Sequence, residues 1–265
     1  MTPYCSELLP LCEDIAQAAF KIAGQAELKH TEHKLLDPKL LALALLCRTL
    51  SNFRGAVRMV ELGWVVEARV LTRCCFENQL VIGGLYNHGV EFAQQIKADD
   101  VAGRKARLRF IAENESIFGA LSAETRDEMA KAQDSLQASA KASYLRFKEA
   151  SALGPFNEIY LAYSQYSGDA AHPTFTALMR HFSFEERTAV FDVEPHADEH
   201  QLDETLHLAC ISLMSAAVAV NEMCGFTEAG KQLPILNARL HSIQAEKFGE
   251  RSVGDPERRL EIKTE

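Results

Sequence analysis

An arginine and a glutamate interrupt an apolar row on one predicted helix, and chemistry can first be assigned to these two side chains. Steps of three and four residues place on one helix face the positions Val66, Val70, Arg73, Glu77, Leu80 and Gly84. An unpaired charge among apolar neighbours is costly, so Arg73 and Glu77 must find partners. Two interpretations remain open. The two side chains form a buried ion pair that locks the register of neighbouring helices, or Arg73 binds an anion that Glu77 orients or deprotonates.

A second group of polar side chains lies in the latter half of the chain. Tyr160, Tyr163 and Ser167 share one helix face, and His172 follows shortly afterwards, just before Pro173. An imidazole can act as a general acid or base, or simply cap a helix. If the fold brings His172 beside the arginine–glutamate pair, those three are candidate catalytic residues. Tyr163 and Ser167, together with the arginine, are then candidate ligand-binding residues.

Other arrangements typical of known chemistry are weaker or missing. His196, His200, Asp203 and His207 have the spacing of metal ligands along a helix face. Asp198 as a helix cap would leave His196 outside the helix, and His200 and His207 would lie about 10 Å apart along the axis. We therefore predict no metal site and no cofactor. The sequence has no glycine-rich phosphate-binding motif and no G-x-S-x-G nucleophile motif.

Charge and composition restrict the classes of partner and compartment. The 265 residues carry a net charge of −9, which argues against general binding to nucleic acid. The basic run of residues 104–109 leaves contact with RNA as a weak alternative. The seven cysteines form no C-x-x-C pair, which is typical of buried free thiols in a reducing compartment. The apolar stretch Leu40–Cys47 is too short to span a bilayer, and no secretory signal is visible, so we expect a cytoplasmic protein without membrane contact.

Helical periodicity runs through almost the whole chain and predicts an all-α fold. We expect a multi-helix bundle with a central, buried helix over about 64–85, stopped by Gly83-Gly84 and the Asn87-His88-Gly89 segment. Asp37-Pro38 and Asp198 are expected helix starts, the latter with Gln201 in a capping box. Other helices are predicted at about 4–26, 38–62 with a packing seam reaching Trp64, 91–118, 123–152, 198–225 and 234–248. Residues 156–180 are expected to be helical with a break at Ser167-Gly168-Asp169, and a short hairpin or loop is expected at 182–193. Residues 1–248 would form one domain, followed by a polar, frayed tail at 249–265.

Two short motifs carry a resemblance to a known family. The first motif reads Glu67-Ala68-Arg69-Val70-Leu71-Thr72-Arg73-Cys74-Cys75-Phe76-Glu77, and the second reads Tyr163-Ser164-Gln165-Tyr166-Ser167-Gly168-Asp169-Ala170-Ala171-His172-Pro173. Over about residues 35–225 the chain resembles a family of bacterial all-helical proteins of unknown function, with an A-R-x-L-x-R-x-x-x-E helix followed by Y-x-x-x-S and H-P. That family resembles HEPN helical bundles and is associated with abortive infection. The resemblance implies Arg73, Glu77, Ser167 and His172 as candidate site residues.

Three functions follow from these expectations. The first is a polar pocket at Arg73, Glu77 and His172 that binds a small anionic or nucleotide-like ligand or a protein partner, in phage defence or stress response. The second is a metal-independent HEPN-like ribonuclease with His172 as acid–base, although no arginine here precedes a histidine at the spacing those enzymes use. The third is a dimerisation or scaffold module, a homo-oligomer whose ion pair is only structural.

Overall fold

The computed structural model describes residues 2–27, 32–114, 122–137, 142–185, 188–193 and 198–248. Most of these residues are helical, which confirms the all-α prediction. The expected frayed tail at 249–265 lies outside the described residues.

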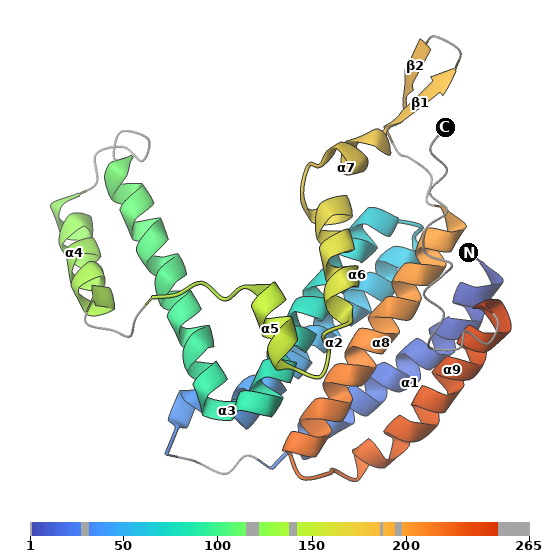
Figure 1. Cartoon of the computed structure of the whole chain (residues 1–265), viewed down its shortest axis with the longest axis horizontal. Helices are drawn as coiled ribbons and strands as arrows, with labels where there is room; N and C mark the ends of the chain where they lie inside the picture. Colours follow the sequence, from blue (N-terminus) through green and yellow to red (C-terminus); the bar gives the residue numbers. More distant parts are fainter. Residues whose placement is uncertain are drawn as a thin grey trace.

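Five helices build the bundle and its core. They are α1 (Pro3–Gln25), α2 (Pro38–Glu61), the first half of α3 (Val65–Glu113), α8 (Glu199–Met223) and α9 (Leu233–Phe248). In Figure 1, α8 lies between α3 on one side and α1 and α9 on the other. Fully buried apolar side chains from all of them fill the interior, among them Leu8, Leu46, Ile82 and Leu213. Two short 3-10 turns, η1 (Lys34–Leu36) and η3 (Ala229–Gln232), precede α2 and α9.

Local sequence signals mark where these helices begin. Asp37 caps α2 by accepting from the backbone N–H groups of Lys39 and Leu40, and Pro38 occupies the first turn, as predicted. Asp198 caps α8 in the same way. Gln201, expected to complete a capping box there, instead accepts a hydrogen bond from Arg180.

The predicted stop at Gly83-Gly84 is wrong, because α3 continues through both glycines. A Cβ on Gly84 would lie 2.4 Å from the ring of Phe92, and one on Gly83 would lie 2.9 Å from the ring of Phe156. These glycines therefore allow close packing. The helix instead kinks within the other predicted stop segment, at Gly89, whose φ of 52° is outside the helical range. Trp64, expected at the end of the α2 packing seam, is 54% exposed at the start of α3.

Beyond the kink, α3 leaves the bundle as an arm with α4 (Ala123–Gln137) along it (Figure 1). The predicted single helix over 123–152 is wrong, because α4 ends at Gln137 and a second helix, α5 (Phe147–Leu153), begins after a non-helical segment. In that segment the N–H of Leu145 donates to the carboxylate of Asp99 at 2.9 Å. Hydrogen bonds to α3 thus replace those that a continuous helix would make.

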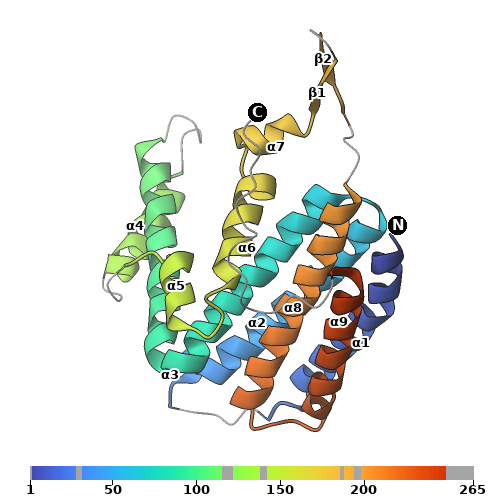
Figure 2. The ribbon, with the colours of Figure 1, turned by 45° about the vertical axis from the view of Figure 1, so that its right-hand side comes forward.

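A second projecting part leads away from the bundle. It consists of α6 (Ile159–Tyr166), the π-helical turn η2 (Ser167–Ala171), α7 (Phe175–Met179) and a hairpin of β1 (Phe182–Glu185) and β2 (Thr188–Phe191). The predicted break at Ser167-Gly168-Asp169 is confirmed: α6 ends at Tyr166, and the new helix expected after it, α7, begins at Phe175. The hairpin is the alternative that the structure confirms over a plain loop, with Phe182 opposite Phe191 and Phe184 opposite Ala189. Figure 2 shows the hairpin extending beyond α7, and in the described chain α7 is the element that it contacts besides itself.

Two helices, α2 and α8, are long and apolar enough to cross a membrane by length and composition alone. Two-thirds of the most apolar stretch of α8 is buried inside the fold, as in the core helix of a soluble protein. The expected absence of membrane contact stays a prediction.

Candidate functional site

A buried charge cluster centres on Arg69, one turn before the predicted Arg73. Arg69 lies on α3 with only 4% of its side chain exposed. Its Nη1 bonds to Asp169 of η2, and its Nη2 donates to Glu204 of α8 at 2.9 Å. Its Nε donates to the hydroxyl of Thr205 at 3.3 Å. One guanidinium thereby joins three separate segments of the chain.

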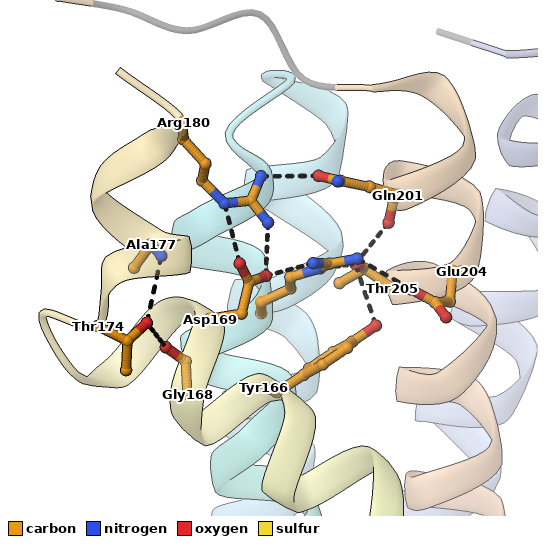
Figure 3. Close-up of polar contacts among 10 residues, drawn as sticks. Tyr166, Gly168, Asp169, Thr174, Ala177, Arg180, Gln201, Glu204 and Thr205 are labelled. Carbon is orange, nitrogen blue, oxygen red and sulfur yellow. Dashed lines mark hydrogen bonds and ion pairs between the residues drawn. The ribbon is translucent and has the colours of Figure 1, made fainter. Parts of the chain in front are cut away.

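Asp169 also accepts hydrogen bonds from a second arginine. The Nε and Nη2 of Arg180, just after α7, donate to the two carboxylate oxygens of Asp169 at 3.0 and 2.5 Å (Figure 3). The remaining Nη1 of Arg180 donates to the side-chain carbonyl of Gln201 on α8 at 2.7 Å. We call Arg69, Asp169, Arg180, Gln201 and Glu204 the clasp, because they fasten η2 and α7 to the bundle.

The turn that carries Asp169 is shaped by its neighbours. Residues 167–171 form a π-helical turn at the end of α6, and Thr174 begins α7 by accepting from the N–H of Ala177 at 3.2 Å. The Thr174 hydroxyl donates back to the carbonyl of Gly168 at 2.6 Å (Figure 3). Single π turns often occur at functional sites, and here the turn holds the carboxylate between two arginines.

A buried tyrosine supports the clasp from below. The ring of Tyr166 lies 4.8 Å from the guanidinium carbon of Arg69, and its hydroxyl lies 3.3 Å from that of Thr205. The Thr205 hydroxyl gives its proton to the carbonyl of Gln201 at 2.6 Å, so Tyr166 must be the donor to Thr205. Burial is the main cause that raises the pKa of Tyr166, to about 12. This tyrosine is therefore a neutral hydrogen-bond donor.

The clasp is a closed, neutral set. Two guanidiniums face two carboxylates, and each guanidinium has a partner on all three of its nitrogens. Burial would raise the pKa of Asp169, but the hydrogen bonds and charges of Arg180 and Arg69 outweigh it and lower that pKa. Because every guanidinium nitrogen already has a partner within the fold, the clasp is arranged to hold segments together.

The predicted pair of Arg73 and Glu77 does form. The Nη2 of Arg73 lies 2.6 Å from a carboxylate oxygen of Glu77, and both side chains are about one-fifth exposed. The Arg73 guanidinium lies 5.5 Å from the ring centre of Tyr163, and its Nε is buried without a hydrogen-bond partner among the described residues. Burial raises the pKa of Glu77, while Arg73 and Arg48 act in the opposite direction. This pair is less completely satisfied than the clasp.

The other predicted residues lie on the segment from α6 to α7. Tyr163 contacts the pair through its ring, and Ser167 begins the π-helical turn, partly buried. His172 is exposed at the end of that turn, where its carbonyl accepts from the N–H of Thr174 at 2.8 Å. Within the described part of the chain, no hydrogen bond or ion pair joins His172 to Arg73 or Glu77. A catalytic role for His172 with that pair stays a prediction.

The sequence did not single out Arg69, although the family-like motifs at 67–77 and 163–173 both contain clasp residues. Arg69 stands in the first motif and Asp169 in the second, so the residue types were visible. Arg73 drew attention because it shares a face with Glu77. Nothing in the sequence pairs Arg69 with Glu204, which belongs to a helix far along the chain.

A separate polar group ties α1 and α9 to α8. Asp203 is completely buried and accepts from the hydroxyl of Thr2, the thiol of Cys5 at 3.1 Å and the ammonium of Lys247. One turn later, the Nδ1 of His207 lies 2.8 Å from the hydroxyl of Tyr4. Among the described residues no cluster of histidine, cysteine and acidic side chains could hold a metal, and His196 lies outside them.

The chain is similar to one protein family. A model of the family DUF5677, described as a family of unknown function, matches residues 39–189, more than half of the chain. The chain belongs to this family. No curated protein and no solved structure matches the chain, so the expected likeness to HEPN bundles stays a prediction.

The DUF5677 match separates the two sides of the clasp. It includes α2, α3 and the whole α6–α7 segment, and therefore Arg69, Asp169, Arg180 and the Arg73–Glu77 pair. It ends within the hairpin, before Gln201 and Glu204 on α8. The family segment thus contributes both arginines and the carboxylate between them.

Proposed function

We propose that this DUF5677 chain is a self-associating scaffold protein, and that a second copy covers the apolar surface of α7 and the hairpin. That surface, the arm surface, consists of the side chains of Phe175, Leu178, Phe182, Phe184 and Phe191. The observation that carries the proposal is their exposure: Phe175, Phe184 and Phe191 are 78%, 68% and 61% exposed.

The exposed phenylalanines of the hairpin lie on one of its faces. Directly opposed residues of an antiparallel pair point to the same face, so Phe182, Phe184, Ala189 and Phe191 share one face. The other face carries Ser183, Glu185, Thr188 and Val190, of which Val190 is the apolar member. A two-stranded hairpin with no further layer is only marginally stable in water. A hairpin with an aromatic face that contacts only α7 among the described elements is therefore typical of an element completed by a partner.

The arm surface is large enough for a dimer. Its five side chains expose about 600 Å², taking about 200 Å² for a whole aromatic side chain and slightly less for leucine. A standard interface buries about 800 Å² per partner, of which a little over half is apolar. The clasp supports this role because it fixes η2 and the end of α7, and with them the start of the hairpin, to α3 and α8. A segment that is already ordered loses less entropy on binding.

Light scattering coupled to size exclusion, at about 1 to 100 µM chain, tests the proposal. We expect the unmodified chain to shift from monomer to dimer with rising concentration. The double substitution Phe184→Ser and Phe191→Ser should leave a monomer with unchanged helix content by circular dichroism. Phe110→Ser is the matched control, since Phe110 is 55% exposed on the α3 arm. A monomer at every concentration, or a dimer that survives the double substitution, overturns the proposal.

A second candidate is the small-anion pocket at Arg73, favoured by the buried Nε that has no partner among the described residues. An anion with two acceptor oxygens would complete the guanidinium. Inorganic phosphate should then raise the melting temperature of the unmodified chain but not that of Arg73→Gln. Arg58→Gln, in an exposed pair with Glu61, is the control. Equal shifts in all three chains would remove this candidate.

A further inference from the structure

We infer that two copies associate through the outer edge of β2, so that the two hairpins form one four-stranded antiparallel sheet. This inference rests on the proposed self-association and specifies its geometry. Edge strands carry a row of backbone donors and acceptors that can pair with another chain. The alternation of hydrogen-bonded and non-hydrogen-bonded pairs in the hairpin determines which residues have outward-facing backbone groups.

The backbone groups that point away from the hairpin belong to the residues of its apolar face. The N–H of Asp192 donates to the carbonyl of His181 at 2.9 Å, so that opposed pair is a hydrogen-bonded one. Hydrogen-bonded and non-hydrogen-bonded pairs alternate in an antiparallel ladder. The pairs Phe182–Phe191 and Phe184–Ala189 are therefore non-hydrogen-bonded, and their N–H and C=O groups point outward.

Of the two strands, β2 has the open edge. In the described chain β1 packs against α7 as well as β2, whereas β2 contacts β1 alone. No described residue hydrogen bonds with the outward groups of Ala189 or Phe191. The strand Thr188–Phe191 also contains neither a charged residue nor proline, two of the protections found on exposed edges. The edge is thus open.

Two-fold pairing of β2 with itself is sterically complementary. With Val190 opposite Val190 of the second copy, each Ala189 pairs with the Phe191 of the other chain, and their outward groups form the hydrogen bonds. A small side chain then lies beside a large one. Each row of the sheet reads Phe184, Ala189, then Phe191 and Phe182 of the second copy, which makes the two apolar faces continuous.

A backbone substitution at Ala189 tests the edge and leaves the phenylalanines of the apolar face in place. Ala189→Pro removes an outward N–H but leaves the bonds inside the hairpin, and should raise the dimer dissociation constant at least about tenfold. Ala189→Ser retains the N–H and should dimerise like the unmodified chain. If Ala189→Pro dimerises normally while the Phe184→Ser, Phe191→Ser chain does not, edge pairing is wrong although self-association stands. If the unmodified chain is a monomer, the proposed function itself fails.

Cross-linking gives an independent readout of the register. In a Cys47→Ser background, which removes the exposed thiol, Val190→Cys places two thiols opposite each other across the two-fold axis. Oxidised glutathione accepts the two electrons as two thiols become a disulfide, and should yield a covalent dimer. Thr188→Cys, two residues from the axis, should remain uncross-linked. Equal cross-linking at both positions would contradict this register.

Discussion

At the scale of single residues, two arginines one turn apart on α3 have different surroundings. Arg69 is buried with hydrogen bonds from three of its nitrogens, whereas Arg73 is one-fifth exposed and retains an unpartnered Nε among the described residues. A fully paired buried charge fixes neighbouring segments, and removing one partner is costly because the other charge stays buried. Arg69 is therefore the arginine that stabilises the fold.

Asp169→Asn should lower the free energy of unfolding by about 3 kcal/mol, since it removes the carboxylate shared by Arg69 and Arg180. Denaturant unfolding followed by circular dichroism measures this, with a fall in melting temperature of roughly 10 °C. Asp100→Asn, in an exposed pair with Arg104, should change stability by less than about 1 kcal/mol. Similar losses in the two variants would show that the clasp does not stabilise the fold.

His207 should make stability depend on pH. Burial, and then the charge of His241, lowers the pKa of His207 to about 4, against about 6.5 in the unfolded chain. Between these values the unfolded state binds the proton and the folded state does not, so stability falls as pH drops from about 6.5 to about 4. The free energy of unfolding should fall by about 3 kcal/mol over this pH range.

Unfolding titrations across that range test the histidine. His207→Gln should flatten the slope, and His200→Gln, at an exposed position, should leave it intact. Asp169 and Asp203 act at lower pH. Their pKa values are lowered in the fold, so the stability they contribute is present above about 4 and is lost as pH falls through the folded pKa. A slope unaffected by His207→Gln would contradict the assignment.

At the scale of elements, close backbone approaches decide how the helices pack. Gly154, just after α5, approaches Gly83 of α3 so closely that a Cβ on Gly154 would lie 2.9 Å from the Gly83 carbonyl carbon. Gly83 and Gly84, expected to end a helix, are therefore packing positions, and α3 runs on to its kink at Gly89, the last glycine of the predicted stop.

Gly154→Ala should destabilise the fold by about 1 to 3 kcal/mol, because the new methyl group meets backbone that must move. Gly168→Ala is the control: nothing lies within 4 Å of the Cβ position in the π-helical turn, and alanine there should be neutral or slightly stabilising. Chemical denaturation of both variants gives the comparison. A neutral Gly154→Ala would mean that α5 can shift away from α3 without cost.

At the scale of the whole molecule, stability and association reside in different parts. The core joins α1, α2, α3, α8 and α9, while the hairpin projects and contacts α7 alone in the described chain (Figures 1 and 2). The clasp lies at their junction. The bundle should therefore fold without the hairpin, whereas the arm surface needs the bundle to hold it in place.

Replacing residues 182–191 with a short glycine–serine linker should leave the melting temperature within about 3 °C of the unmodified chain, because few buried contacts are lost. Helix content by circular dichroism should be unchanged, and the dimer should disappear in light scattering. A large drop in melting temperature, measured below the concentration at which dimers form, would show that the hairpin stabilises the bundle itself.

Patterns within single segments determined much of this protein. The three–four spacing predicted the all-α fold and the caps at Asp37 and Asp198, because helix periodicity and capping depend on residues a few positions apart. The same local logic predicted the Arg73–Glu77 pair, one turn apart. It failed over 123–152, where hydrogen bonds to α3 replace a continuous helix.

Tertiary structure alone decided which arginine is buried and what it binds. Arg69 meets Asp169 and Glu204 across separations of 100 and 135 residues, and no local pattern encodes such a meeting. Burial, which makes those charges costly to separate and shifts their pKa values, is created by packing and does not exist in any one segment. The exposure of the hairpin's aromatic face was settled in the same way, because its alternation is equally compatible with a buried sheet.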